Sequence, residues 1–153
     1  MMHLSNYIPS AQPTLRVTPA CLASDMRVLV WKIGYVASDE LAVGNQLVVP
    51  TLNSATERTT IRSIRRYQST YFVRINGHID VTEGHPFRTP LGTWNRARNL
   101  VIGDTLITLV GLRRVETIDL VHRNMVSAID LVTDKAFIVE GFVTIGKSAL
   151  PQG

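Results

Sequence analysis

Short runs of β-branched and aromatic residues, each ended by Gly, Pro or Asn, restrict the fold of this chain more than any other feature. Runs of this length and composition are typical of β-strands, whereas no stretch keeps a helical period beyond one turn at 93–101. Asn76-Gly77 between two β runs predicts a hairpin with a two-residue loop, because both positions accept a positive φ. We therefore predict an all-β fold. The runs occupy residues 27–33, 46–50, 70–75, 105–110 and 136–145.

An internal repeat indicates how these strands are organised. The stretches "LAVGNQL" at 41–47 and "LVIGDTL" at 100–106 have Leu, Gly and Leu at the same offsets, 59 residues apart. Each copy precedes a β run, and two copies favour two related β halves rather than a repeat array. The alternative is that this pattern is simply a common way for a loop to enter a strand.

The length of 153 residues fits a single domain with one core. Residues 1–20 carry three prolines among polar residues, so we expect an extended arm. The β domain is then expected to span 21–147, followed by a short tail at 148–153.

Composition limits the classes of protein to which this chain could belong. No stretch approaches the ~18 uncharged apolar residues of a membrane helix, the first residues do not resemble a signal peptide, and Cys21 is the single cysteine. A cytoplasmic protein with no membrane contact is therefore expected. The net charge of +4 favours acidic partners, and one strand over 57–67 would place Arg58, Arg62 and Arg66 on a basic face. The few aromatic residues do not favour nucleic-acid binding.

The stretch "VTEGHPFRTP" at 81–90 holds the main candidate for chemistry. Pro86 pushes His85 toward extended backbone angles, and Gly84 permits a tight bend before it. Thr82 lies three residues before His85, so its hydroxyl and the imidazole are able to reach one carbonyl or amide. The alternative is a hydrogen-bonded histidine with a structural role.

No cofactor or metal is expected. His78, Asp80, Glu83 and His85 lie close together in the sequence. Their spacing matches no familiar zinc site, and no cysteine ligands accompany them.

Motifs along most of the chain, about residues 19–147, together resemble the Hint superfamily of Hedgehog autoprocessing domains, inteins and bacterial intein-like domains. The nucleophilic cysteine that opens the family module corresponds to Cys21 in "ACLAS". The family motif T-x-x-H falls on Thr82 and His85, and an aspartate near the penultimate strand falls on Asp130 in "AIDLV". A further motif is matched by Trp94, Ala97, Leu100, Gly103, Asp104 and Leu106.

The resemblance implies a flattened horseshoe of many short strands with pseudo-twofold halves. It also implies an autoprocessing reaction, in which Cys21 attacks the carbonyl of Ala20 and turns the amide into a thioester by an N-to-S acyl shift. In this scheme Asp130 assists the thiol, Thr82 and His85 polarise the amide, and His85 protonates the departing nitrogen. Water or an added thiol then releases the arm.

The chain departs from the intein pattern at its end. Inteins finish on a His-Asn pair, which would fall on Ile145 and Gly146, and the histidine common before the last aromatic motif is replaced by Ala136. Without an asparagine amide, side-chain cyclisation does not cut the chain on the C-terminal side, so splicing is excluded. Whether the remaining N-terminal half is active or inactive stays open.

A different class of function also stays open. By analogy with stand-alone Hint-like modules, the chain would be a non-catalytic structural or interaction protein, for instance a component of a phage virion or another assembly. Other protein chains would then contact residues 1–20, which could add a strand to a neighbouring sheet, or the basic face of Arg58, Arg62 and Arg66. Its location would be the cytoplasm or a virus particle assembled there.

Overall fold

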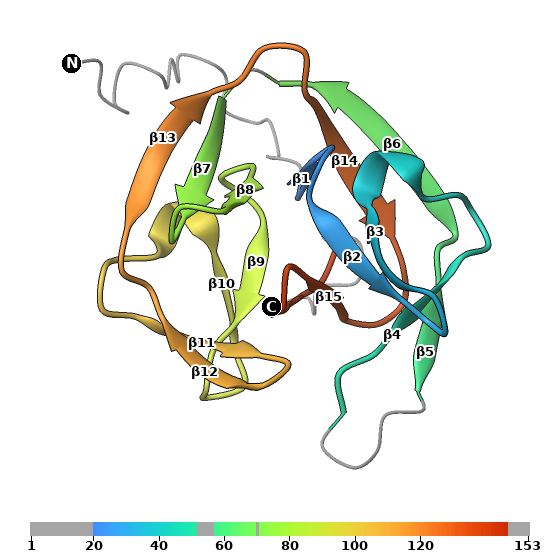
Figure 1. Cartoon of the computed structure of the whole chain (residues 1–153). Coiled ribbons are helices and arrows are strands. Elements are labelled where there is room, and N and C mark those ends of the chain that lie inside the picture. The colour runs from blue at the N-terminus through green and yellow to red at the C-terminus, as the bar shows by residue number, and fades with distance from the viewer. Residues whose placement is uncertain (1–19, 52–56, 70, 147–153) are drawn as a thin grey trace.

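A computed structural model describes residues 20–51, 57–69 and 71–146. Within these ranges almost all regular structure is β-strand, with two short 3-10 turns, η2 (Ser38–Glu40) and η3 (Ala97–Asn99) (Figure 1). The all-β prediction is confirmed. Apart from Ala20, the expected arm lies outside the described residues, as does the expected tail.

The first sheet contains the candidate site. Its strands follow the order β13-β7-β8-β1-β14-β6, so the short N-terminal strand β1 lies between two strands from much later in the chain. These strands are β1 (Leu22–Ala23), β6 (Ser63–Gln68), β7 (Tyr71–Ile75), β8 (Ile79–Val81), β13 (Ile118–His122) and β14 (Ser127–Val132).

The second sheet follows the order β10-β9-β16-β15-β2-β4-β5, with β3 paired to β2, β11 to β16, and β12 to β11. In Figure 1 the strands from β2 to β6 lie mainly on one side of the molecule and β7 and β10 to β13 on the other. The strands of this sheet are β2 (Arg27–Val30), β3 (Gly34–Ala37), β4 (Gln46–Val48), β5 (Arg58–Thr60), β9 (Pro86–Arg88), β10 (Trp94–Arg96), β11 (Thr105–Thr108), β12 (Gly111–Arg114), β15 (Phe137–Val139) and β16 (Phe142–Thr144).

The internal repeat corresponds to two equivalent loop-to-strand units. In each copy a 3-10 turn leads into a loop whose glycine has a positive φ, 98° at Gly44 and 103° at Gly103. The side chains of Asn45 and Asp104 accept a hydrogen bond from the backbone N–H three residues earlier, at 2.8 and 2.9 Å. A strand follows each loop, β4 in one half and β11 in the other. The two halves are therefore related as the repeat predicts.

The hairpin predicted at Asn76-Gly77 joins β7 to β8. Asn76 and Gly77 have φ values of 54° and 78°, and the N–H of His78 donates to the carbonyl of Ile75 at 3.2 Å. The first residue pair of the hairpin is Ile75 with Ile79, so the loop includes His78 and has three residues, not the two that were predicted. This hairpin brings residues 79–81 against β1.

The prediction of one strand over 57–67 is wrong. The chain leaves the second sheet after β5 and enters the first sheet at β6, with Ile61 and Arg62 between them. Ile61 is fully buried, which anchors the crossing in the core. Arg58, Arg62 and Arg66 remain exposed, but they do not share the face of a single strand.

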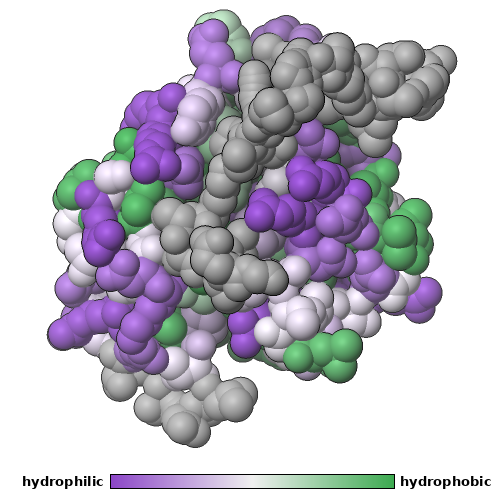
Figure 2. Space-filling model, turned by 180° about the vertical axis from the view of Figure 1, so that it is seen from behind, coloured by the Kyte–Doolittle hydropathy of each residue, from purple (hydrophilic) through white to green (hydrophobic). Residues whose placement is uncertain are grey.

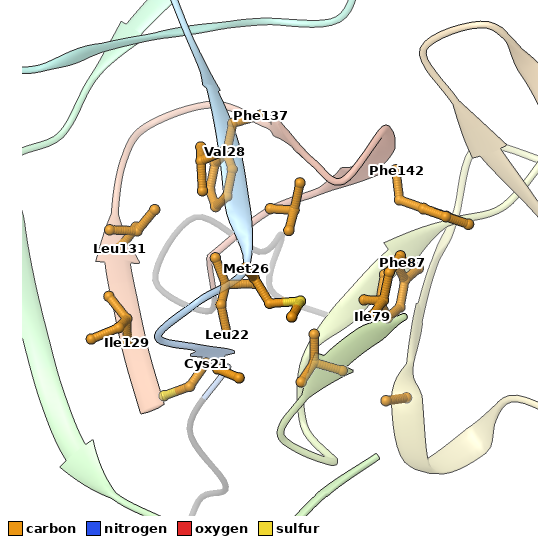
Figure 3. Packing of buried hydrophobic residues seen from close by; sticks show 14 of the residues in the cluster. Cys21, Leu22, Met26, Val28, Ile79, Phe87, Ile129, Leu131, Phe137 and Phe142 are labelled. Atoms are coloured by element: carbon orange, nitrogen blue, oxygen red, sulfur yellow. The ribbon is translucent and has the colours of Figure 1, made fainter. Parts of the chain in front are cut away.

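Buried side chains from both sheets form one hydrophobic core that reaches the candidate site (Figure 3). On the face that Figure 2 shows, hydrophilic residues cover most of the surface and hydrophobic residues form separate patches. No helix in the described part of the chain is long and apolar enough to span a membrane. The core residues labelled in Figure 3 are Cys21, Leu22, Met26, Val28, Ile79, Phe87, Ile129, Leu131, Phe137 and Phe142.

Candidate active site

The sheet order places Cys21 at the centre of the candidate site. β1 pairs with β8 on one side and with β14 on the other, and the register of both pairs sets Cys21 across from Thr82 and Asp130. The Cys21 side chain is fully buried and points toward β14 (Figure 3). Three of the predicted residues, from segments far apart in the sequence, therefore meet in one sheet.

Thr82 holds the peptide bond between Ala20 and Cys21. Its Oγ1 accepts a hydrogen bond from the N–H of Cys21 at 2.9 Å. Its own N–H donates to the carbonyl of Cys21 at 3.0 Å. Because Ala20 is 2% exposed and Cys21 0%, this peptide bond is shielded from bulk water. The threonine hydroxyl thus fixes the nitrogen that a cleavage reaction would release.

His85 is aimed by the turn over residues 82–85. Its N–H donates to the carbonyl of Thr82 at 3.0 Å, and its carbonyl accepts from the N–H of Ala97 at 2.8 Å. Pro86 follows as the first residue of β9, which keeps His85 out of the helical region as predicted. The turn therefore brings the Thr82 and His85 side chains to the same end of β8.

Two groups hold the His85 ring. Thr144 Oγ1 lies 2.5 Å from His85 Nε2 and 2.6 Å from the carbonyl oxygen of Pro86. Since a carbonyl only accepts, Thr144 donates its single proton to Pro86, and its oxygen is left to accept from Nε2. The ring also hydrogen-bonds to the backbone of Ala20.

His85 is uncharged at neutral pH. Complete burial disfavours the imidazolium ion and lowers the pKa of His85 from 6.5 to about 3. The backbone of Ala20 opposes this decrease, and the positive charge of Arg96 adds to it. At this pKa the ring is a weak base, and it must gain a proton before it can donate one to the peptide nitrogen.

Asp130 lies on the opposite side of Cys21 from Thr82. It is 5% exposed, and the β14-β6 register sets Arg65 directly across from it. Arg65 Nη1 is 3.6 Å from Asp130 Oδ2, an ion-pair contact whose arginine side chain is more than half exposed. A carboxylate is thus held next to the buried thiol, with one cation on its outer side.

Gly146 passes close to Asp130 where the chain leaves β16. A Cβ atom on Gly146 would lie 2.5 Å from the carbonyl oxygen of Leu131 and 3.9 Å from Asp130 Oδ1. The first distance is too short for any real contact, so this position accepts no side chain without movement of the backbone. An asparagine at position 146 would therefore clash with the backbone of Leu131.

Two contributors to the site were not predicted from the sequence. Thr144 reaches His85 only because β16 pairs with β9, through Thr144 and Phe87. Arg65 reaches Asp130 through the register of two strands that are more than 50 residues apart. Neither residue carries a local motif, since each is located by long-range strand pairing.

The acidic and histidine residues near β8 do not form a metal site. Across the described ranges, no three His, Cys, Asp or Glu side chains lie together in a way that could hold a metal ion. Asp80 is instead paired with two arginines: Arg74 Nε and Nη2 contact it at 2.7 and 2.9 Å, and Arg123 Nη1 at 2.9 Å. Arg123 continues the network to Asp25 at 2.7 Å.

Comparison with solved structures gives the fold. The chain is similar to a bacterial intein-like domain from Clostridium thermocellum, with a TM-score of 0.69 and 20% identity over 83% of this chain and 98% of that one. It has the Hint fold. The TvoVMA intein shares this fold at a TM-score of 0.67 and 18% identity over 81% of this chain and 95% of that one.

A DnaB intein from Synechocystis sp. PCC 6803 has the same Hint fold, with a TM-score of 0.64 and 14% identity over 83% of this chain and 98% of that one. No protein-family model matches the sequence, and no curated protein matches it significantly. At these identities the similarity establishes the architecture alone. The predicted Hint horseshoe is confirmed, and the chemistry must be argued from the site itself.

Proposed function

We propose that this chain is a Hint-type autoprocessing domain that performs an N-to-S acyl shift at the Ala20-Cys21 bond. One observation carries the proposal: this bond is buried, its N–H is held by Thr82 Oγ1 at 2.9 Å, and the neutral ring of His85 lies beside the Ala20 backbone. The fold is that of inteins and an intein-like domain. A peptide bond that only joined the arm to the β domain would not need to be buried and held by hydrogen bonds in this way.

In the proposed reaction the Cys21 thiol loses its proton and its sulfur attacks the carbonyl carbon of Ala20. The C–N bond of the Ala20-Cys21 amide then breaks, and a C–S thioester bond replaces it. The nitrogen of Cys21 takes up one proton and becomes an amine, so atoms and charge balance. Water or an external thiol cleaves the thioester and releases residues 1–20.

Asp130 is the proposed acceptor of the thiol proton. It stands across from Cys21 on β14, and the ring of His85 lies beside the backbone of Ala20. Because the ring is neutral, His85 accepts a proton before it passes one to the departing nitrogen. Thr82 positions that nitrogen through its hydroxyl. His85 thus gains a proton before it donates one, whereas a histidine that starts as a cation donates its proton first.

Mass spectrometry of the intact protein tests this proposal. Freshly purified wild type treated with dithiothreitol or hydroxylamine is expected to lose residues 1–20, because both reagents attack thioesters. Cys21→Ala is expected to keep its full mass under the same conditions. If wild type and Cys21→Ala both stay uncut while circular dichroism shows both to be folded, the proposed acyl shift is wrong.

A second candidate function, a non-catalytic scaffold, is favoured by the contact between Arg65 and Asp130. Arg65 occupies one side of the carboxylate at 3.6 Å and competes with the thiol for it. In this role the chain joins other proteins of an assembly, such as a virion, through residues 1–20 or through Arg58, Arg62 and Arg66. An uncut wild type that co-purifies with a stable partner complex, lost on deletion of residues 1–19, supports this role.

A further inference from the structure

A groove lies between the two halves of the molecule, away from Cys21. Its volume is about 560 Å³. One wall comes from β9 to β12 and β16, and the other from the end of β4 and from Ala136, which precedes β15. The lining is mainly apolar; it includes Pro50, Trp94, Ile107, Leu112, Ala136 and Val143.

Arg88 is the one cation among the described residues that line this groove. It stands directly across from Trp94 in the β9-β10 pair, and its guanidinium stacks on the Trp94 ring at 4.7 Å from the centroid. Within the described residues no carboxylate lies in ion-pair range of Arg88, and no hydrogen bond joins its side chain to another group. When a guanidinium stacks on an aromatic ring, its N–H groups point outward in the plane of the guanidinium and remain able to pair with a carboxylate.

Apolar side chains continue from the groove onto the surface. Leu109 is 48% exposed and Leu112 64%, and both line the groove. Val110, between them at the tip of the β11-β12 hairpin, is 87% exposed. Large exposed apolar side chains next to an unpaired cation are more typical of a contact surface than of a solvated loop.

We propose that this groove binds an extended segment of a partner protein, in which an Asp or Glu side chain lies next to a large apolar residue. The carboxylate pairs with Arg88, and the apolar side chain enters the groove against Trp94 and Leu112. Charge complementarity supports this occupant, because Arg88 has no carboxylate partner within the described part of the chain and the net charge of the chain is +4. The proposal uses none of the residues around Cys21 and is independent of the acyl shift.

The chain supplies a matched control for this groove. Arg58 stacks on Trp31 at 5.0 Å from the ring centroid, the same pair of residue types outside the groove. Replacing Arg88 by Gln removes the cation from the groove, and Arg58→Gln removes an equivalent cation elsewhere. Leu112→Ser alters an exposed residue of the apolar rim, so it tests the groove without disturbing the core.

The experiment selects a displayed library of random 12-residue peptides on the folded wild type. Retained peptides are then synthesised with a fluorophore, and their dissociation constants are measured by fluorescence anisotropy. Enriched peptides are expected to carry an acidic residue beside an apolar one. Affinity is expected to fall at least tenfold with Arg88→Gln, with Leu112→Ser and with Glu→Gln or Asp→Asn in the peptide, and less than twofold with Arg58→Gln.

Several results would overturn the proposal. No peptide is retained above the level of Arg88→Gln, or the retained peptides lack acidic residues, or they bind Arg88→Gln as tightly as wild type. If sedimentation shows a concentration-dependent dimer that Leu112→Ser abolishes, the groove instead binds a second copy of the chain. Thermal unfolding of Arg88→Gln and Leu112→Ser establishes that each variant is folded before affinities are compared.

Discussion

At the residue scale, the most informative side chain is the histidine. His85 combines complete burial with hydrogen bonds to Thr144 and to the backbone of Ala20. The sequence predicted its position through Gly84 and Pro86. Nothing in the sequence pointed to Thr144, whose role depends on the pairing of β16 with β9. Local motifs thus locate the ring, and tertiary structure sets its charge.

Protonation of His85 is expected to weaken the fold. Its pKa is about 3 in the folded chain and near 6.5 when unfolded, so the unfolded state binds the proton more readily. Stability is therefore highest above pH 6.5 and falls as pH drops from 6.5 toward 3. Between pH 7 and pH 5.5 this histidine alone is expected to remove about 1 kcal/mol of unfolding free energy.

Urea unfolding of wild type and His85→Gln at both pH values measures this contribution, since glutamine does not titrate. The exposed residue His122 gives the control variant His122→Gln, which should keep the pH dependence of wild type. Equal pH dependence in wild type and His85→Gln would mean that the ring is not buried in its neutral form.

At the scale of elements, the position of β8 beside β1 depends on an ion network. Asp80, 1% exposed, lies in the middle of β8 and receives bonds from Arg74 on β7 and from Arg123, which follows β13. Arg123 also bonds Asp25 in the turn after β1. These contacts tie β7, β8 and the β1-β2 turn together, two residues before Thr82.

Replacing Asp80 by Asn is expected to destabilise the fold by about 3 kcal/mol, because two arginines lose a buried partner. Asp25→Asn is the graded comparison, since its side chain is 54% exposed and pairs with Arg123 alone; about 1 kcal/mol is expected. Chemical unfolding of the three proteins measures both values. Similar losses for the two variants would show that burial of Asp80 does not matter to the network.

Some strands and turns could be predicted from the sequence and others could not, and the difference has physical reasons. The strands rich in β-branched residues, the Asn76-Gly77 hairpin and the repeated glycine loops have local signatures and appear in the structure. The run at 136–145 is an exception, because it forms two strands, β15 and β16, joined by a turn at Glu140 and Gly141. The break at Ile61 has none, because an alternating basic sequence is equally compatible with one strand or with two. The contact of Arg65 with Asp130 depends on register across the sheet, which short-range patterns do not encode.

At the scale of the whole molecule, this Hint fold leaves no free space on the C-terminal side of the candidate site. The N-terminal part of the site contains Cys21, Thr82, His85 and Asp130, whereas the exit of the chain passes Leu131 so tightly that Gly146 has no room for a Cβ atom. Any C-terminal cleavage of the intein type would need space that this packing removes.

The double variant Ile145→His, Gly146→Asn is therefore not expected to release residues 147–153. Because the new Cβ would lie 2.5 Å from the Leu131 carbonyl oxygen, the backbone must shift, and a loss of about 2 kcal/mol in stability is expected. Gly146→Ala should lose a similar amount, since the clash is at Cβ. Mass spectrometry and thermal unfolding test this, and a stable double variant that cuts its own C-terminal segment would contradict the described packing.

The location of β1 between β8 and β14 also bears on timing during synthesis. A chain emerging from the ribosome presents its single thiol early, but the strand that carries the neighbouring carboxylate is translated more than 100 residues later. Any self-cleavage at this thiol would consequently be postponed until Asp130 has been translated, so the order of translation itself would protect the nascent protein from premature scission.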